Sequence, residues 1–287
     1  MSMRLDSRVA LITGGGSGLG RECALLFAEE GARVVVFDRV EKRAKDAAEL
    51  VVGKGGEAIA VVGDVGVESD IARAVDTAVD SFGKLDIMFA NAGIMQSDFG
   101  RGISFDETAA EVWNEILSTN LTGVLWSLKH AVRVMKDRGG AIVVTGSAAA
   151  LRAYPNLALY SATKGGVNGL ALAVSRDVGR FGIRINVLNP SGGMSPNLIL
   201  PPDAPVVGMS IEEAAGDKWD PITAAGPLKL STPPRLRDNA NAVLFMVSDE
   251  ARWMTGKSMT PADGGVLNSI AMNFSDDWTT DLVADIP

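Results

Sequence analysis

The chain has one cysteine and one histidine among its 287 residues. With a single cysteine, Cys23, no intrachain disulfide can form, and a reducing compartment such as the cytoplasm is the expected location. Because zinc sites in proteins use several Cys and His ligands, we predict no metal site, although a site built from carboxylates stays open. Cys23 lies in a predicted helix, where we interpret it as a core residue rather than a nucleophile.

Basic residues and long apolar runs are also scarce. The chain carries 27 Lys and Arg against 35 Asp and Glu, a net charge of −8, which argues against binding to nucleic acid or to an anionic membrane surface. No stretch has the length and hydrophobicity of a signal peptide or of a membrane span. With 47% hydrophobic residues the chain can still bury a large core, so we expect a soluble protein whose partner is a small molecule.

Short apolar runs rich in β-branched residues recur at regular intervals and predict strands. Their hydrophobicity is continuous rather than alternating, which is typical of strands covered on both faces. Helical patterns lie between them, including one that begins with Ser69 as a helix cap and ends at Gly83. This alternation predicts a single-domain, Rossmann-like α/β fold over residues 1–287, a doubly wound parallel sheet of about seven strands with helices on both faces. The predicted strands are residues 9–13, 33–37, 58–62, 85–90, 141–146, 183–188 and 257–261.

Three segments depart from this rhythm. Residues 95–112 form a polar insertion after the fourth strand. Residues 190–234 hold nine of the twelve prolines and follow the carboxyl end of a strand, where open α/β sheets bind ligands. We interpret this second segment as a substrate-binding lid, with plain disorder as the alternative. Residues 266–287 form an acidic tail, either solvated or, through Phe274 and Trp278, packed on another subunit.

A glycine-rich turn, "TGGGSGLG", follows the first strand. Gly14, Gly18 and Gly20 have the spacing that lets the backbone turn sharply and brings a helix N-terminus close to a pyrophosphate. Asp38, at the end of the second strand, can accept hydrogen bonds from the adenosine ribose hydroxyls and would repel a 2′-phosphate. We therefore predict NAD as the cofactor, whereas Arg39 beside it could pair with that phosphate and favours NADP. The alternative for Asp38 is a turn or cap residue ahead of the next helix.

Tyr160 and Lys164 stand four positions apart and share one face of a predicted helix. A tyrosine exchanges protons near neutral pH only if its pKa falls by about 3 units, or about 4 kcal/mol. One cation about 4 Å away supplies a similar amount at an effective dielectric constant of about 20. We therefore predict that Lys164 lowers the pKa of Tyr160, while an ordinary surface pair is the plain alternative.

Two further polar residues come from the segment before this helix. Ser147 directly follows the fifth strand, where its hydroxyl could donate to a substrate oxygen, although a turn serine is the simpler explanation. Tyr154 could line the substrate pocket or merely fill space.

With these motifs in order along the chain, the sequence resembles the classical short-chain dehydrogenase/reductase family. The resemblance covers residues 7–190 and 235–265, which is most of the chain. It rests on the glycine-rich turn, Asp64 with Val65, "NAG" at 91–93, Asn120 in "STNLTG", Ser147, the Tyr160–Lys164 pair and "NP" at 189–190.

The resemblance implies a role for each matching residue. Tyr160 is expected to be the general acid or base, Lys164 to lower its pKa and hold the nicotinamide ribose, and Ser147 to orient the reacting oxygen. Asn120 is expected to anchor a water linked to Lys164, although from the sequence pattern alone it could be a helix cap. The expected substrate contacts are Ser147, Tyr154 and Tyr160. The expected cofactor contacts are Gly14, Ser17, Gly18, Leu19, Gly20, Asp38, Asp64, Val65, Asn91, Ala92, Gly93, Tyr160, Lys164, Pro190, Gly193 and Ser195.

The sequence departs from the family pattern after Pro190. The family usually has glycine next and threonine a few positions on, whereas this chain has Ser191 and Ser195. Ser195 keeps a hydroxyl for the nicotinamide carboxamide, but Gly192 and Gly193 make the segment pliable and its position open.

The function predicted on this basis is an NAD(H)-dependent oxidoreductase that interconverts a secondary alcohol and a ketone. An NADP-dependent carbonyl reductase of the same fold and, further off, a non-catalytic cofactor-sensing or scaffold protein are the alternatives. The family resemblance also leads us to expect a homotetramer, with a dimer second.

Overall fold

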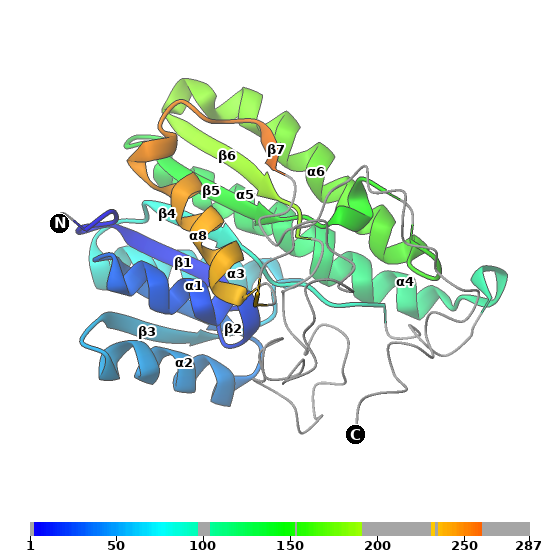
Figure 1. The fold of residues 1–287 in the computed structure, drawn as a ribbon, viewed down its shortest axis with the longest axis horizontal. Coiled ribbons are helices and arrows are strands. Elements are labelled where there is room, and N and C mark those ends of the chain that lie inside the picture. Colours follow the sequence, from blue (N-terminus) through cyan, green and yellow to red (C-terminus); the bar gives the residue numbers. More distant parts are fainter. Residues whose placement is uncertain (1–2, 97–103, 153, 191–230, 233–234, 260–287) are drawn as a thin grey trace.

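The computed structural model describes residues 3–96, 104–152, 154–190, 231–232 and 235–259 (Figure 1). Within these ranges the chain alternates strand and helix. The strands are β1 Val9–Thr13, β2 Arg33–Asp38, β3 Glu57–Val62, β4 Ile87–Ala90, β5 Gly140–Thr145, β6 Ile183–Leu188 and β7 Lys257–Met259. The helices are α1 Gly18–Glu29, α2 Glu41–Gly53, α3 Glu68–Phe82, α4 Ala110–Leu117, α5 Gly123–Met135, α6 Ala158–Val178 and α8 Leu236–Val247.

The described strands form one sheet in the order β3-β2-β1-β4-β5-β6-β7, and every neighbouring pair is parallel. The chain runs outward from β1 to β3, crosses over to β4, and then runs outward in the other direction. The predicted doubly wound parallel sheet is confirmed. Because the strands are parallel, their carboxyl ends lie along one edge of the sheet, where ligands bind in such folds.

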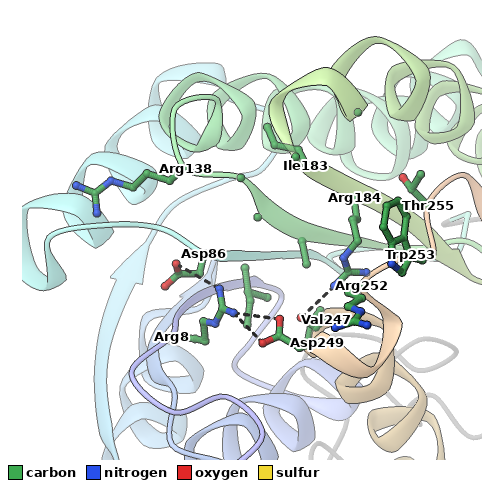
Figure 2. A pocket seen from close by; sticks show the side chains of 16 residues that line it. Arg8, Asp86, Arg138, Ile183, Arg184, Val247, Asp249, Arg252, Trp253 and Thr255 are labelled. Atoms are coloured by element: carbon green, nitrogen blue, oxygen red, sulfur yellow. Dashed lines mark hydrogen bonds and ion pairs between the residues drawn. The ribbon is translucent and has the colours of Figure 1, made fainter.

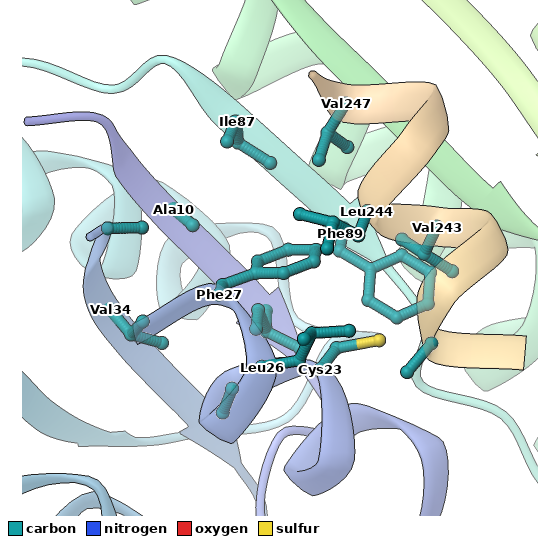
Figure 3. Packing of buried hydrophobic residues seen from close by; sticks show 14 of the residues in the cluster. Ala10, Cys23, Leu26, Phe27, Val34, Ile87, Phe89, Val243, Leu244 and Val247 are labelled. Carbon is teal, nitrogen blue, oxygen red and sulfur yellow. The ribbon is translucent and has the colours of Figure 1, made fainter. Parts of the chain in front are cut away.

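Alternate side chains of the central strands enter two cores. Ala10 and Ile12 of β1 pack with α1, α2 and α8 on one face, whereas Val9 and Leu11 pack with α3, α5 and α6 on the other. Figure 3 shows the first core, in which Phe27 and Cys23 of α1 face Phe89 of β4 and the side chains of α8. Cys23 is fully buried, and burial raises the pKa of its thiol well above the ordinary value. The interpretation of Cys23 as a core residue is confirmed.

The predicted cap of α3 is wrong. The helix begins at Glu68 after Val67, so Ser69 lies inside the first turn. The Asp70 carboxylate, in the first turn of the helix, accepts a hydrogen bond from the Asp64 N–H at 2.9 Å and so ties the preceding turn to the helix. The predicted C-terminal glycine is confirmed, since Gly83 ends the helix in the left-handed conformation.

Part of the irregular sequence is described. Within residues 95–112, a 3₁₀ turn at Phe105–Glu107 leads into α4. The interpretations of residues 190–234 as a lid and of residues 266–287 as a tail lie outside the described residues, apart from Pro190, Ser231 and Thr232. No helix in the described ranges is both long enough and apolar enough to cross a lipid bilayer.

Candidate active site

The glycine-rich turn between β1 and α1 is too tightly packed for larger residues. A Cβ on Gly20 would lie 2.2 Å from the carbonyl oxygen of Gly14, and one on Gly14 would lie 3.0 Å from the Cα of Ala92. Gly14 and Gly18 also have positive φ angles of 63° and 50°. Ser17 precedes the helix in an extended conformation, and its side chain does not cap the first turn. The N-terminus of α1 therefore meets the edge of the sheet with first-turn N–H groups that suit a pyrophosphate.

Asn91 joins three strand ends beside this turn. Its backbone N–H and that of Ala92 donate to the Thr13 hydroxyl at 3.0 and 3.1 Å. The Asn91 side chain donates to the Thr13 carbonyl at 3.2 Å and accepts from the Thr145 hydroxyl at 3.1 Å. No role was assigned from the sequence to Thr13 or Thr145; Thr13 ends one predicted strand, and Thr145 stands one position before the end of another. They hold the ends of β1, β4 and β5 at a fixed spacing.

Asp38 is buried at the end of β2, with 6% of its surface exposed. One carboxylate oxygen accepts from the Gly16 N–H at 3.1 Å, and the other accepts from the Val40 N–H at 3.0 Å. The bond from Gly16 attaches Asp38 to the glycine-rich turn. The bond from Val40 lies in the turn ahead of α2, which agrees with the alternative interpretation of Asp38 as a turn residue. Each oxygen can accept one more hydrogen bond, so contact with a ribose hydroxyl remains feasible. Arg39 is exposed.

Asp64 and Val65 follow β3. Asp64 accepts a hydrogen bond from the Gly66 N–H at 2.8 Å, which fixes the turn. Val65 is buried against the start of α5, where a Cβ on Gly123 would lie 2.7 Å from a Val65 methyl group. The pair thus lies at the same sheet edge as Asp38, as its expected position beside an adenine requires.

Asn120 is not a helix cap, so that interpretation of the sequence is wrong. It lies fully buried in a π-helical turn, Ser118–Thr122, that joins α4 to α5. Its side chain accepts from the Ile94 N–H at 2.8 Å and donates to the Ile94 carbonyl at 2.9 Å. It also donates to the Thr163 hydroxyl of α6 at 3.3 Å. A side chain that binds the loop after β4 and helix α6 cannot also cap α5.

Lys164 of α6 lies next to Asn120 under the loop after β4. A Cβ on Gly93 would lie 3.3 Å from the Lys164 ammonium nitrogen and 3.4 Å from the Asn120 amide oxygen, so Gly93 packs closely over both groups. The ammonium donates to the Thr145 carbonyl at 2.8 Å and lies 5.7 Å from the ring centre of Tyr160. Lys164 is 2% exposed, and burial lowers its pKa to about 8.

Tyr160 lies one turn earlier on α6 and is 5% exposed. Burial is the largest influence and raises its pKa to about 12, a hydrogen bond with the Ser147 side chain lowers it, and Tyr154 raises it. The prediction that Lys164 lowers the pKa of Tyr160 is therefore wrong for the chain by itself. Loss of water around the phenol outweighs the influence of Ser147, because the phenolate is the form that burial penalises.

Ser147 holds a fixed place beside this phenol. It is 9% exposed and precedes a short 3₁₀ turn, whose Ala149 N–H donates to the Ser147 hydroxyl at 3.1 Å. The backbone N–H of Ser147 donates to the Asn189 amide oxygen at 3.0 Å. The carbonyl of Pro190, directly after Asn189, accepts from the Ala148 N–H at 2.9 Å. Gly193 and Ser195 lie outside the described residues.

Tyr154 lies close to the phenol of Tyr160, within an apolar wall. Its hydroxyl accepts a hydrogen bond from the Arg152 guanidinium at 2.6 Å, and that guanidinium lies 4.7 Å from the Tyr154 ring centre. The apolar side chains of this wall are Ile94, Met95, Trp113, Ile116, Ala149, Leu157 and Leu159.

A cavity of about 410 Å³ lies at the opposite edge of the sheet, at the amino ends of β1, β4, β5 and β6 (Figure 2). Arg8 forms ion pairs there with Asp86 at 3.9 Å and Asp249 at 3.1 Å. Arg184 donates to backbone carbonyls at the end of α8. None of the predicted site residues that the structure describes lines this cavity, which separates it from the candidate active site.

The sheet, the glycine-rich turn and the buried group of Ser147, Tyr160 and Lys164 together define a dinucleotide-dependent oxidoreductase. Residues 8–198 match the sequence model of the protein family described as short chain dehydrogenase. The chain therefore belongs to the short-chain dehydrogenase/reductase family.

Individual relatives cover nearly the whole chain. Tropinone reductase-like 1 of Erythroxylum coca is 38% identical, over 91% of this chain and 91% of its own length. Cyclohexanol dehydrogenase of Acinetobacter sp. is 35% identical, over 89% of this chain and 94% of its own. The crystal structure of carveol dehydrogenase from Mycobacterium avium in complex with NAD superposes with a TM-score of 0.75 at 30% identity, covering 91% of this chain and 98% of that one.

Proposed function

We propose that this oxidoreductase interconverts a secondary alcohol and a ketone with NAD(H), and that Tyr160 is its general acid or base. The observation that carries the proposal is that the buried Tyr160 phenol lies beside the Ser147 side chain, which lowers its pKa, with the Lys164 ammonium 5.7 Å from the centre of the same ring. Ser147 comes from the turn after β5, and Tyr160 and Lys164 come from α6; the three meet at the edge of the sheet that carries the glycine-rich turn.

The nicotinamide cofactor would supply the hydride acceptor or donor when bound. The turn from Gly14 to Gly20 suits its pyrophosphate because glycines at 14 and 20 let the backbone of the turn pack closely against the start of α1, whose first-turn N–H groups can donate to phosphate oxygens. Asp38 would accept from the adenosine ribose, Asp64 and Val65 would border the adenine, and Asn91 to Gly93 would line the cleft. Lys164 would hold the nicotinamide ribose, next to Pro190, Gly193 and Ser195.

Tyr160 would transfer the hydroxyl proton of the substrate. With a pKa of about 12 the phenol is protonated at neutral pH, which suits donation to the oxygen of a ketone. Alcohol oxidation needs the phenolate, and the Lys164 ammonium, 5.7 Å from the ring centre of Tyr160, is a positive charge that would stabilise it. Ser147 would donate to the same substrate oxygen and hold it within reach of the phenol. The apolar wall around Tyr154 favours a substrate whose carbinol carbon carries hydrocarbon groups.

Tyr160→Phe tests the assignment directly. The change removes only the phenol oxygen, so we expect NAD binding to stay within about twofold while turnover of a secondary alcohol falls by at least about a thousandfold. The measurement is reduced-nicotinamide absorbance with a panel of cyclic secondary alcohols, together with NAD affinity by calorimetry. Turnover close to that of the native chain would refute the role of Tyr160, and NAD binding without turnover across the panel in the native chain would favour the non-catalytic alternative.

We propose NAD rather than NADP because the buried Asp38 carboxylate lies against the glycine-rich turn, where it would repel a 2′-phosphate. The carveol dehydrogenase that resembles this chain was solved with NAD. The native chain is expected to have a kcat/KM at least about tenfold higher with NAD than with NADP, which corresponds to about 1.4 kcal/mol. Steady-state kinetics with both cofactors and one alcohol would measure this ratio. A ratio below one would show that Arg39 decides the preference instead.

A further inference from the structure

Three polar side chains that the proposed chemistry does not use lie directly behind Ser147. They are Asn168 on α6, Asn189 after β6 and Ser258 on β7. Asn168 is 8% exposed, and Asn189 is fully buried. Their hydrogen bonds connect three separate elements of the fold to the loop that carries Ser147.

The Asn189 amide has one defined orientation. Its oxygen accepts from the Ser147 N–H at 3.0 Å and from the Asn168 amide at 2.9 Å. Its nitrogen donates to the Ser258 hydroxyl at 2.7 Å and to the Met259 carbonyl at 3.3 Å. A flip of this amide would set a donor against the Ser147 N–H, so the network fixes which atom faces Ser147.

Asn168 completes the network from the helix side. Its oxygen accepts from the Ser258 hydroxyl at 2.6 Å, and its nitrogen also donates to the Lys164 carbonyl at 3.0 Å. A Cβ on Gly146 would lie 2.2 Å from the Asn189 oxygen, so a glycine before Ser147 is what allows the amide to approach. A fully satisfied buried network of this kind holds its members in one arrangement.

We propose that Asn168 is a positioning residue for the reaction: through Asn189 it holds the backbone of Ser147, and with it the Ser147 hydroxyl, against the Tyr160 phenol. Ser258 supports this action by bonding both amides. The inference rests on the proposed function, because it assigns Asn168 a part in the same chemistry.

Asn168→Leu is the first test, because leucine has a similar size and removes both the donor and the acceptor. The variant is expected to keep its NAD affinity within about twofold and to lose at least about tenfold in kcat, since the Ser147 hydroxyl is no longer fixed. In a Ser147→Ala background, the same change is expected to cost less than about twofold more, because the group that Asn168 positions is already absent.

Asn186→Leu is the matched control. Asn186 is 1% exposed, and it also connects β6 to the start of β7, donating to the Met254 carbonyl at 2.8 Å and accepting from the Lys257 N–H at 3.1 Å. It has no hydrogen bond to Ser147, so its loss is expected to lower stability without the selective loss of kcat. Equal losses of kcat in the two variants, or losses that multiply in the Ser147→Ala background, would overturn the inference.

Ser258→Ala and Ser258→Thr keep the test decisive if Asn168→Leu does not fold. Alanine removes the hydroxyl that bonds both amides, and threonine retains it. A loss of kcat in the alanine variant that the threonine variant largely restores supports the inference, whereas equal kcat values in both overturn it. An inactive native chain would instead reject the proposed function, so the two failures are distinguishable.

Discussion

Burial opposes charge on both ionisable groups at the centre of the candidate site. It raises the pKa of Tyr160 to about 12 and lowers that of Lys164 to about 8, so each group is shifted toward its neutral form. From the sequence, the spacing of the two residues was correctly taken as a sign of proximity. The cost of taking both groups out of water could not be read from it, because burial depends on the segments that cover them.

The buried Lys164 therefore lowers the free energy of unfolding by an amount that depends on pH. The unfolded chain binds more protons than the folded chain between the lowered pKa of about 8 and the ordinary 10.5, so the free energy of unfolding rises with pH in that window. The full rise is about 3 kcal/mol, at about 1.4 kcal/mol for each pKa unit. Lys164→Met removes this titration and should lose turnover. It is expected to be at least as stable as the native chain at pH 7 and to lack the rise, as measured by urea unfolding at pH 7, 8, 9 and 10.

The control is Lys129→Met on the exposed side of α5, which should keep the native slope. Tyr160 acts in the opposite direction, since its raised pKa makes stability fall as pH increases from about 10 to about 12, above the range measured. Equal pH slopes in the native and Lys164→Met chains would contradict a lowered pKa for Lys164.

At the scale of elements, the sequence predicted every strand of the described sheet to within two residues at its start. Residues 85–90 contain β4, which begins at Ile87, and the other predicted strands begin within one residue of their observed positions. Continuous β-branched runs between glycine turns are sufficient for this, because each strand is covered on both faces. The ends of helices were harder to predict: α3 begins at Glu68 after Val67, which makes no side-chain cap, so the serine that the local pattern favours already lies inside the first turn.

The candidate site was predictable where its residues form a local motif and not where they bridge elements. The glycine-rich turn, Ser147, Tyr160 and Lys164 stand in short recognisable stretches. Asn168 and Ser258 do not, since the hydrogen bond between them joins positions 90 apart in the sequence. Asn120 is intermediate: its motif was recognised, but its place in a π-helical turn came only from the structure.

At the scale of the whole molecule, the carboxyl and amino edges of the sheet have different roles. The predicted site residues that the structure describes gather at or near the carboxyl ends of the strands, whereas the opposite edge holds the cavity of Figure 2 and its ion pairs. Changes at the amino edge should therefore act on folding stability without acting on chemistry. Arg184 of β6 provides the clearest case.

The Arg184 guanidinium donates to the carbonyls of Met246, Val247, Ser248 and Met254, at 2.7, 3.3, 3.1 and 3.3 Å, and so fastens the end of α8 to the sheet. Arg184→Met leaves these carbonyls without their charged donor, and we expect the free energy of unfolding to fall by about 3 kcal/mol. Arg8→Met is the control in the same cavity, where loss of exposed ion pairs should cost less than about 1 kcal/mol. Both variants are expected to keep kcat and NAD affinity within about twofold at a temperature where they are folded. A fall in kcat for folded Arg184→Met would contradict the separation of the two edges, and equal losses of stability would contradict the special role of Arg184.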